Sequence, residues 1–94
     1  MAYVGIIELT FRLDGCGSLK EKRQVVRSLV DRLRHHFNVS AAETKHQDVW
    51  DLAGIGISVI SGDRGVVARL VEQLIDYAEE TTEAELVGIH HEII

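Results

Sequence analysis

The stretch that decides the fold of this chain is Ser18–Phe37, SLKEKRQVVRSLVDRLRHHF. Ser18 and Glu21 are three residues apart, as in a capping box, where the serine hydroxyl accepts the Glu21 amide and the glutamate accepts the Ser18 amide. Apolar residues then recur at spacings of three and four, the period of one helix face. They are Leu19, Val26, Leu29, Val30, Leu33 and Phe37. The spacing predicts an amphipathic helix that begins at Ser18 and ends near Phe37.

Strand patterns lie on both sides of this helix. In residues 3–13 apolar side chains occupy alternate positions, which is typical of a half-buried strand. After the helix, residues 37–45 predict a modest strand and residues 50–61 a stronger one. The polar residues between them, His46, Gln47 and Asp48, favour a turn, so these two segments predict a hairpin.

The rest of the chain repeats the same order of elements. Asp63, in the Ser-Gly-Asp run that follows the hairpin, is suited to cap a second helix whose apolar stripe extends over residues 66–78. Residues 86–94 predict a last strand. The order strand, helix, strand, strand, helix, strand is typical of a ferredoxin-like α+β domain. We therefore expect residues 1–94 to form one domain, a four-stranded antiparallel sheet with both helices on one face.

The two faces of this sheet differ in the residues they carry. If the first and third strands are central, as in that fold, Tyr3 and Phe11 point toward the helices. Ferredoxin-like RNA readers stack bases on aromatic side chains of the open face, so base stacking is not expected here. The open face is shallow and partly apolar, and a face of this kind can join copies of a chain. The residues of this predicted oligomer interface are Val4, Ile6, Gly54, Gly56 and Ile60.

Composition limits the class of protein. The chain has no apolar run near the roughly 20 residues that cross a bilayer, and its N-terminus lacks the basic and apolar pattern of an export signal. Its one cysteine, Cys16, cannot form an internal disulfide. That usage agrees with a reducing compartment, so we expect a cytoplasmic protein.

Charge is distributed unevenly along the chain. The formal net charge is -5, but residues 1–46 hold eight Lys or Arg against five Asp or Glu, whereas residues 47–94 hold two against ten. The net charge argues against indiscriminate coating of nucleic acid. The division predicts a polarised surface, which either steers an anionic partner to one side or is neutralised where the two halves pack together.

The turn before the first helix, GCGSLKEK at residues 15–22, resembles a phosphate-binding loop only in composition. A Walker loop needs G-x-x-x-x-G-K-[ST], and a dinucleotide fingerprint needs a third glycine where this chain has Lys20. Both spacings fail, and a structural turn is the favoured interpretation. A weaker possibility is that Gly17 and Ser18, at the positive end of the helix, hold one phosphate or carboxylate.

Cationic residues form a stripe on the predicted first helix. At about 100° per residue, Lys20, Arg23, Arg27 and Arg34 fall along one flank of the apolar stripe, with Lys22 at the edge of the buried sector. Basic helix surfaces suit shape-based binding of folded RNA, so these five residues are the predicted RNA-binding set. Two alternatives are a solvated face with Asp31 paired to its neighbours, and neutralisation by the acidic residues of the second helix. Those acidic residues are Glu72, Asp76, Glu79, Glu80 and Glu83.

No motif indicates catalysis, a metal or a cofactor. The histidines occur as adjacent pairs, His35-His36 and His90-His91, whose side chains diverge on a helix or strand, and no spaced Cys or His motif accompanies them. A nucleophile, base and acid cannot be chosen from scattered residues without arbitrary selection. Trp50 is interpreted as a lid on the core. We therefore expect a protein that is not an enzyme and has neither metal nor cofactor.

Three segments resemble a known family. They are S-L-K-E-K-R (18–23), R-S-L-V-D-R-L-R-H-H-F-N-V-S-A-A-E (27–43) and Q-D-V-W (47–50), and they are similar to the YlxP family of small bacterial proteins, long catalogued as a domain of unknown function. Members of that family are typically encoded beside translation initiation factor two and ribosome-binding factor A. The resemblance implies work near ribosome maturation or translation, and it implies no reaction.

Two functions follow as expectations. The first is a non-enzymatic accessory factor that associates with a ribosomal subunit or structured RNA through the basic stripe. The second is a homo-oligomeric interaction module without nucleic-acid binding, and a small anion-binding enzyme or sensor is a weaker third.

Overall fold

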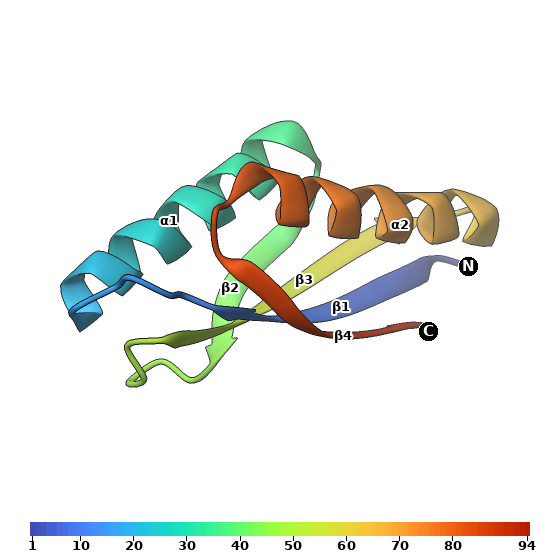
Figure 1. Cartoon of the computed structure of the whole chain (residues 1–94). Coiled ribbons are helices and arrows are strands. Elements are labelled where there is room, and N and C mark those ends of the chain that lie inside the picture. The colour runs from blue at the N-terminus through green and yellow to red at the C-terminus, as the bar shows by residue number, and fades with distance from the viewer.

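The computed structural model describes all 94 residues, and six elements follow one another along the chain (Figure 1). They are β1 (Tyr3–Arg12), α1 (Leu19–His36), β2 (Ser40–Lys45), β3 (Leu52–Ser61), α2 (Arg64–Thr81) and β4 (Glu85–Ile93). The order is the one that the sequence predicts. Neither helix is long and apolar enough to cross a membrane.

The four strands form one antiparallel sheet in the order β2-β3-β1-β4. Both helices cover the same face, as Figure 1 shows, so the ferredoxin-like α+β fold is confirmed. In the central pair Leu9 lies opposite Ile55, and both are 1% exposed under the helices. Phe11 also points into this core, as the alternation predicted, whereas Tyr3 at the beginning of β1 is 37% exposed.

The ends of the helices follow local chemistry. Ser18 Oγ accepts a hydrogen bond from the Glu21 amide at 3.2 Å, and the Glu21 carboxylate accepts one from the Gly17 amide at 2.9 Å. The capping box therefore reaches one residue further back than predicted. Asp63 caps α2 by accepting the Val66 amide at 3.1 Å.

Two strand boundaries differ from the prediction. β2 begins at Ser40 and not at residue 37, because Phe37 is the C-cap of α1 and donates its amide to Leu33 O at 2.9 Å. β3 begins at Leu52 and not at residue 50, because Asp51 belongs to the preceding turn, where its carbonyl accepts the Leu13 amide at 2.9 Å. In both cases a cap or turn takes the backbone groups that a strand would use.

Aromatic contacts join the two helices at one end. Tyr77 of α2 stacks on His36 with ring centroids 4.3 Å apart, and it meets Phe37 edge-on at 5.4 Å. α1 lies over β2 and β3, whereas α2 lies over β1, β3 and β4. The flank of α2 that carries Tyr77 therefore faces α1, and the opposite flank faces β4.

Gly5 allows α2 to approach the sheet closely. A Cβ at this position would lie 2.9 to 3.1 Å from methyl groups of Val59, Val67 and Val71. Replacing Gly5 with Ala should lower the free energy of unfolding by about 1 to 2 kcal/mol, because the extra methyl overpacks the interface. Urea unfolding followed by circular dichroism measures the change.

The matched control is Gly62→Ala. A Cβ there meets nothing within 4 Å, so its effect should stay within about 0.5 kcal/mol. Equal effects of the two substitutions would show that close packing at Gly5 is not what requires glycine.

Candidate nucleic-acid interface

Three cations on α1 form an exposed basic flank, defined here as Lys20, Arg23 and Arg27. No carboxylate of the chain lies within 4.0 Å of their charged groups, since the ion pairs of the structure all involve other residues. Asp31, the predicted local partner of Arg27, makes no such pair. The predicted pairing with Asp31 is therefore wrong, whereas a solvated face without a ligand stays an alternative for these three residues.

The basic flank faces away from α2. Arg34, on the same side of α1, donates to the carbonyl of Ala41 in β2 at 2.7 Å. Arg32, on the other side, donates to the backbone carbonyl and the hydroxyl of Thr81 at the end of α2. These two contacts set the rotation of α1, so the flank projects over the β2 edge of the sheet.

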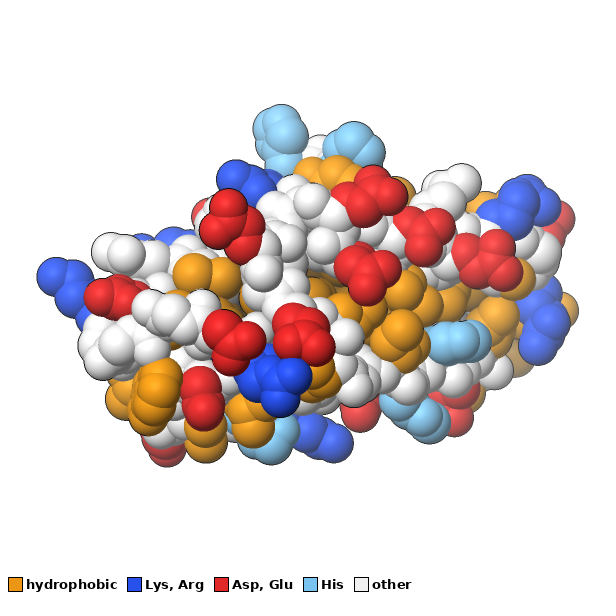
Figure 2. All heavy atoms as spheres, in the orientation of Figure 1, with side chains coloured by type: hydrophobic (Ala, Val, Ile, Leu, Met, Phe, Trp, Pro, Cys, Tyr) orange, Lys and Arg blue, Asp and Glu red, His pale blue; other side chains and the backbone are white.

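The acidic residues of α2 do not neutralise the flank. Glu72, Asp76 and Glu79 lie on the outer surface of α2 and on the flank opposite Tyr77, toward β4, and Figure 2 shows acidic side chains gathered along α2. Glu80 and Glu83 line a groove beside α1, but on the side of α1 that carries Arg32 and not the basic flank. None of them forms an ion pair with α1. The alternative of internal neutralisation is therefore wrong, and the unequal charge of the two chain halves becomes a charge difference between two sides of the domain.

Two cations outside α1, Arg12 and Lys45, are paired with acids. Arg12 donates to Glu85 at 2.9 Å and lies 3.9 Å from Asp14. The hydrogen bond and charge of Glu85, with a smaller contribution from Asp14, raise the pKa of Arg12 above its ordinary value. Lys45 approaches Glu8 at 3.6 Å across the open face. Arg32 and Arg34 have no acidic partner either, but each donates to a backbone carbonyl. The basic flank is therefore the group of cations on α1 that has neither an ion pair nor such a hydrogen bond.

Lys22 corrects the prediction for the RNA-binding set. Its side chain is 0% exposed, and its ammonium lies 2.7 Å from the Glu43 carboxylate of β2. It also donates to the carbonyls of His46 and Gln47, where His46 has a φ of 62° in the left-handed region. A buried ammonium with these partners cannot contact a phosphate, so Lys22 is a structural anchor of the β2–β3 turn.

Arg34 is only partly available. Its side chain is exposed, but the hydrogen bond to Ala41 directs the guanidinium along the edge of β2. We therefore place it at the margin of the basic flank and not in it.

The anion site predicted at Gly17 and Ser18 already holds a carboxylate of the chain itself. Glu21 accepts the Gly17 amide, and the Ser18 hydroxyl accepts the Glu21 amide. An external phosphate would have to displace Glu21, so the structure argues against a site there and supports the structural turn.

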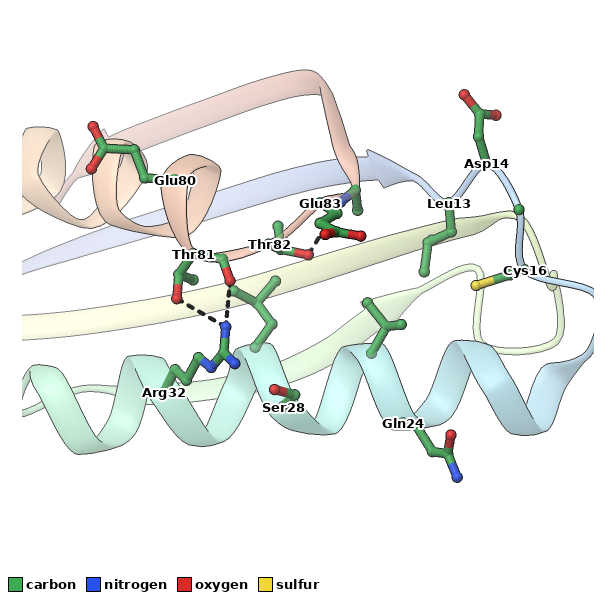
Figure 3. Close-up of a pocket in the computed structure, with 14 residues that line it drawn as sticks. Leu13, Asp14, Cys16, Gln24, Ser28, Arg32, Glu80, Thr81, Thr82 and Glu83 are labelled. Carbon is green, nitrogen blue, oxygen red and sulfur yellow. Dashed lines mark hydrogen bonds between the residues drawn. The ribbon is translucent and has the colours of Figure 1, made fainter.

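A groove that the sequence did not indicate lies beside this turn (Figure 3). Its volume is about 690 Å³, and it runs between α1 and the connection from α2 to β4. Cys16 reaches it from one side, Ser28 and Arg32 from α1, and Glu83 from the connection. Its charged lining consists of one cation, Arg32, and the carboxylates of Asp14, Glu80 and Glu83. These residues come from distant segments, so no sequence spacing could reveal the groove.

The predicted oligomer interface is only partly a free surface. Val4 lies opposite Ile60, which is 63% exposed, and Ile6 is next on the same face. Gly54 and Gly56 are instead covered by the chain: a Cβ there would lie 2.6 Å from Lys45 Cβ and 2.7 Å from Thr44 Cγ2, respectively. The two glycines admit β2 side chains, and assigning them to an interface was wrong.

Trp50 is not a lid on the core. Its side chain is 50% exposed in the β2–β3 turn, next to Val49, which is 38% exposed. The turn is held by hydrogen bonds from the Lys22 ammonium to His46 O and from the Leu13 amide to Asp51 O. The indole is therefore exposed on a turn that is fixed at both ends. No group of three or more His, Cys, Asp or Glu side chains is placed to hold a metal ion.

Comparison with known proteins gives the family. The model of the family described as "Protein of unknown function (DUF503)" matches residues 4–91. The chain belongs to the DUF503 family. The curated protein "Uncharacterized protein YlxP" of Bacillus subtilis (strain 168) is 30% identical over 82 residues, which cover 87% of this DUF503 chain and 89% of that protein. The resemblance to the YlxP family is therefore confirmed.

A solved structure supports the fold alone. The de novo designed protein Foldit4 is similar to this DUF503 chain with a TM-score of 0.60 over 100% of it and 97% of the designed chain, at 12% sequence identity. A designed scaffold with this architecture says nothing about a partner, which agrees with the rule that function lies in sites and not in folds.

Proposed function

We propose that this DUF503 protein is a non-enzymatic accessory factor of the cytoplasm that binds structured RNA in a ribosomal particle through the basic flank of α1. The observation that carries the proposal is the exposure of Lys20, Arg23 and Arg27 without a carboxylate within 4.0 Å. Unpaired cations attract phosphates and release counterions when they bind them.

The geometry of the flank favours a phosphate backbone over bases. Lys20 and Arg27 are seven residues apart on α1, which is about 10 Å along a helix axis and so comparable to the length of a few nucleotides of one strand. Phe11 is buried at 1% exposure and offers no stacking platform on the sheet. Contacts to phosphates of a folded RNA, read by shape, suit this arrangement better than recognition of unpaired bases.

The acidic side of the domain supports an oriented encounter. Glu72, Asp76 and Glu79 lie on the outer surface of α2 and on its flank toward β4, whereas the basic flank lies on the β2 side of α1, and the net charge is -5. Such a distribution repels RNA from one side and attracts it to the other. The protein would therefore bind in one orientation and adhere weakly to nucleic acid in general.

The test is a double charge reversal with a matched control. Arg23→Glu with Arg27→Glu should weaken binding to purified ribosomal subunits by about 10- to 100-fold at roughly 0.1 M salt, and should lower the salt slope of log K by about 1 to 2. Arg64→Glu with Arg69→Glu changes the net charge equally on another exposed helix surface. It should leave the slope unchanged.

Subunit association measured by sedimentation over a salt series decides between the outcomes. If both double variants bind as the unaltered chain does, or if both lose affinity equally, the basic flank is not the RNA contact. Light scattering of the same samples tests the homo-oligomer, which stays a separate prediction.

A further inference from the structure

The outer edge of β4 is a free and regular strand edge. Val4 and Ile94 exchange both backbone hydrogen bonds at 2.8 and 2.9 Å. Because such pairs alternate in an antiparallel ladder, the N–H and C=O groups of Ile89, His91 and Ile93 point away from β1. The ladder is regular from Gly88 onward, since the bulge lies earlier in β4.

The other edge of the sheet is protected. β2 has six residues, a bulge between Glu43 and Lys45, and the Arg34 guanidinium on the carbonyl of Ala41. Bulges, short strands and charged side chains are the usual ways to prevent pairing at an edge. β4 is longer, at nine residues, and its bulge lies before Gly88. From Gly88 onward its one Asp, Glu, Lys or Arg is Glu92, which lies opposite Ile6 on the open face of the sheet.

Apolar side chains accompany the free edge of β4. Ile89 lies opposite the buried Leu9, hence on the helix face of the sheet, yet it is 54% exposed. Val87 is 46% exposed, and Ile93 is half-buried on the same face as Ile89. Nothing in the chain covers the outer side of these residues.

Two carboxylates of α2 lie above the apolar side chains of β4. Glu72 and Glu79 lie roughly 200° to 220° around α2 from Tyr77, which faces α1. They therefore lie on the flank above β4, and no cation is within 4.0 Å of them. Figure 2 shows the result as an apolar strip beneath a row of acidic side chains.

We propose that the β4 edge binds an extended, basic segment of a partner protein, which adds to the sheet as a fifth strand. Backbone groups of the segment pair with the free groups of Ile89, His91 and Ile93. Lysine or arginine at every second position projects on the helix face. Their aliphatic stems cover Ile89, and their charged ends reach Glu72 and Glu79.

The negative charge beside the β4 edge favours a basic segment over a second copy of the chain as the partner. A two-fold pairing of β4 with β4 would bring two α2 helices to the same side of a continuous sheet, with their unpaired carboxylates facing one another. Like charges across an interface oppose association. A basic segment meets the same surface with opposite charge, and this inference does not rest on the RNA contact of α1.

The probe is the peptide acetyl-KVKIKVK-amide, with acetyl-EVEIEVE-amide as its charge-inverted control, added to the full chain. The lysine peptide should bind with a Kd on the order of 10 to 100 µM. At ten times that Kd only about one molecule in eleven has an unoccupied edge. Amide hydrogen exchange of Ile89, His91 and Ile93 should therefore slow about tenfold, since these amides have no hydrogen-bond partner unless the peptide is bound. The glutamate peptide should have no effect.

Variants test the role of the carboxylates. Glu72→Lys with Glu79→Lys should weaken binding of the lysine peptide at least tenfold and allow the glutamate peptide to bind. Asp31→Lys with Asp48→Lys, at exposed positions away from β4, makes the same change of net charge and should do neither. Ile89→Lys should abolish binding, whereas Ile60→Lys, at a similarly exposed isoleucine on the open face, should not.

Three results would overturn the proposal. They are unchanged exchange of the β4 amides with saturating peptide, equal loss of binding in the two carboxylate pairs, and concentration-dependent protection of the β4 amides in the chain alone, which would show that a second copy occupies the edge.

Discussion

Replacing Lys22 with Met should lower the free energy of unfolding by about 3 kcal/mol, because one partner of a buried ion pair is removed and the other remains. The Glu43 side chain is 15% exposed, and its Oε2 lies 2.7 Å from the Lys22 ammonium. No donor makes a hydrogen bond of normal geometry to that oxygen, so the ammonium charge compensates it almost alone. The carbonyls of His46 and Gln47 also lose their donor.

The control removes both charges. Lys22→Met combined with Glu43→Met should recover at least half of the loss, since a paired replacement by apolar residues leaves no uncompensated charge. Urea unfolding gives the free energies, and the fluorescence of Trp50, the one tryptophan of the chain, reports whether the β2–β3 turn has moved. A single variant within 1 kcal/mol of the original, or a double variant no better than the single one, would contradict this role for Lys22.

Replacing Phe11 with Ala should cost about 3 to 5 kcal/mol. Phe11 is the largest fully buried side chain, with 1% exposure, and lies in β1 under the two helices. Truncation leaves a cavity between sheet and helices that rigid β1 and β3 backbones cannot close, so the lost packing adds to the lost hydrophobic transfer free energy.

Phe37→Ala is the comparison for Phe11. Phe37 is only partly buried at the end of α1, where it contacts Tyr77 edge-on at 5.4 Å, so its loss should cost about 1 to 2 kcal/mol. Thermal and urea unfolding of both variants give the difference. Similar costs for the two phenylalanines would mean that the core under α1 and α2 is looser than its burial indicates.

The helices and strands of the fold could be predicted from local sequence patterns. The period of the apolar residues in Ser18–Phe37 and the alternation in β1 reflect which side of each element faces a core, and that information lies within a few residues of sequence. The boundaries at Phe37 and Trp50 were wrong, because a helix cap and a turn compete for the same backbone groups as the strands that follow.

The candidate sites could be predicted from the sequence only in part. A helical wheel could place Lys20, Arg23 and Arg27 on one flank, since they belong to one rigid helix. It could not show that Lys22 meets Glu43, 21 residues further on, or that Arg34 turns to Ala41. It also assigned Gly54 and Gly56 to an open surface, because nothing local shows that Thr44 and Lys45 fold over them.

By itself the sequence determined the elements, their order, the inward faces of the strands and the presence of a cationic stripe, because each depends on neighbours close in the chain. Only the tertiary structure decided which charges are free. The hydrogen bond from Arg34 to Ala41 fixes the rotation of α1, and the stacking of Tyr77 on His36 fixes that of α2. These orientations separate the basic flank from the acidic side of α2. The same packing leaves the β4 edge uncovered. Electrostatic pairing depends on distances of a few ångströms between segments far apart in sequence, and those distances exist only once the chain has packed.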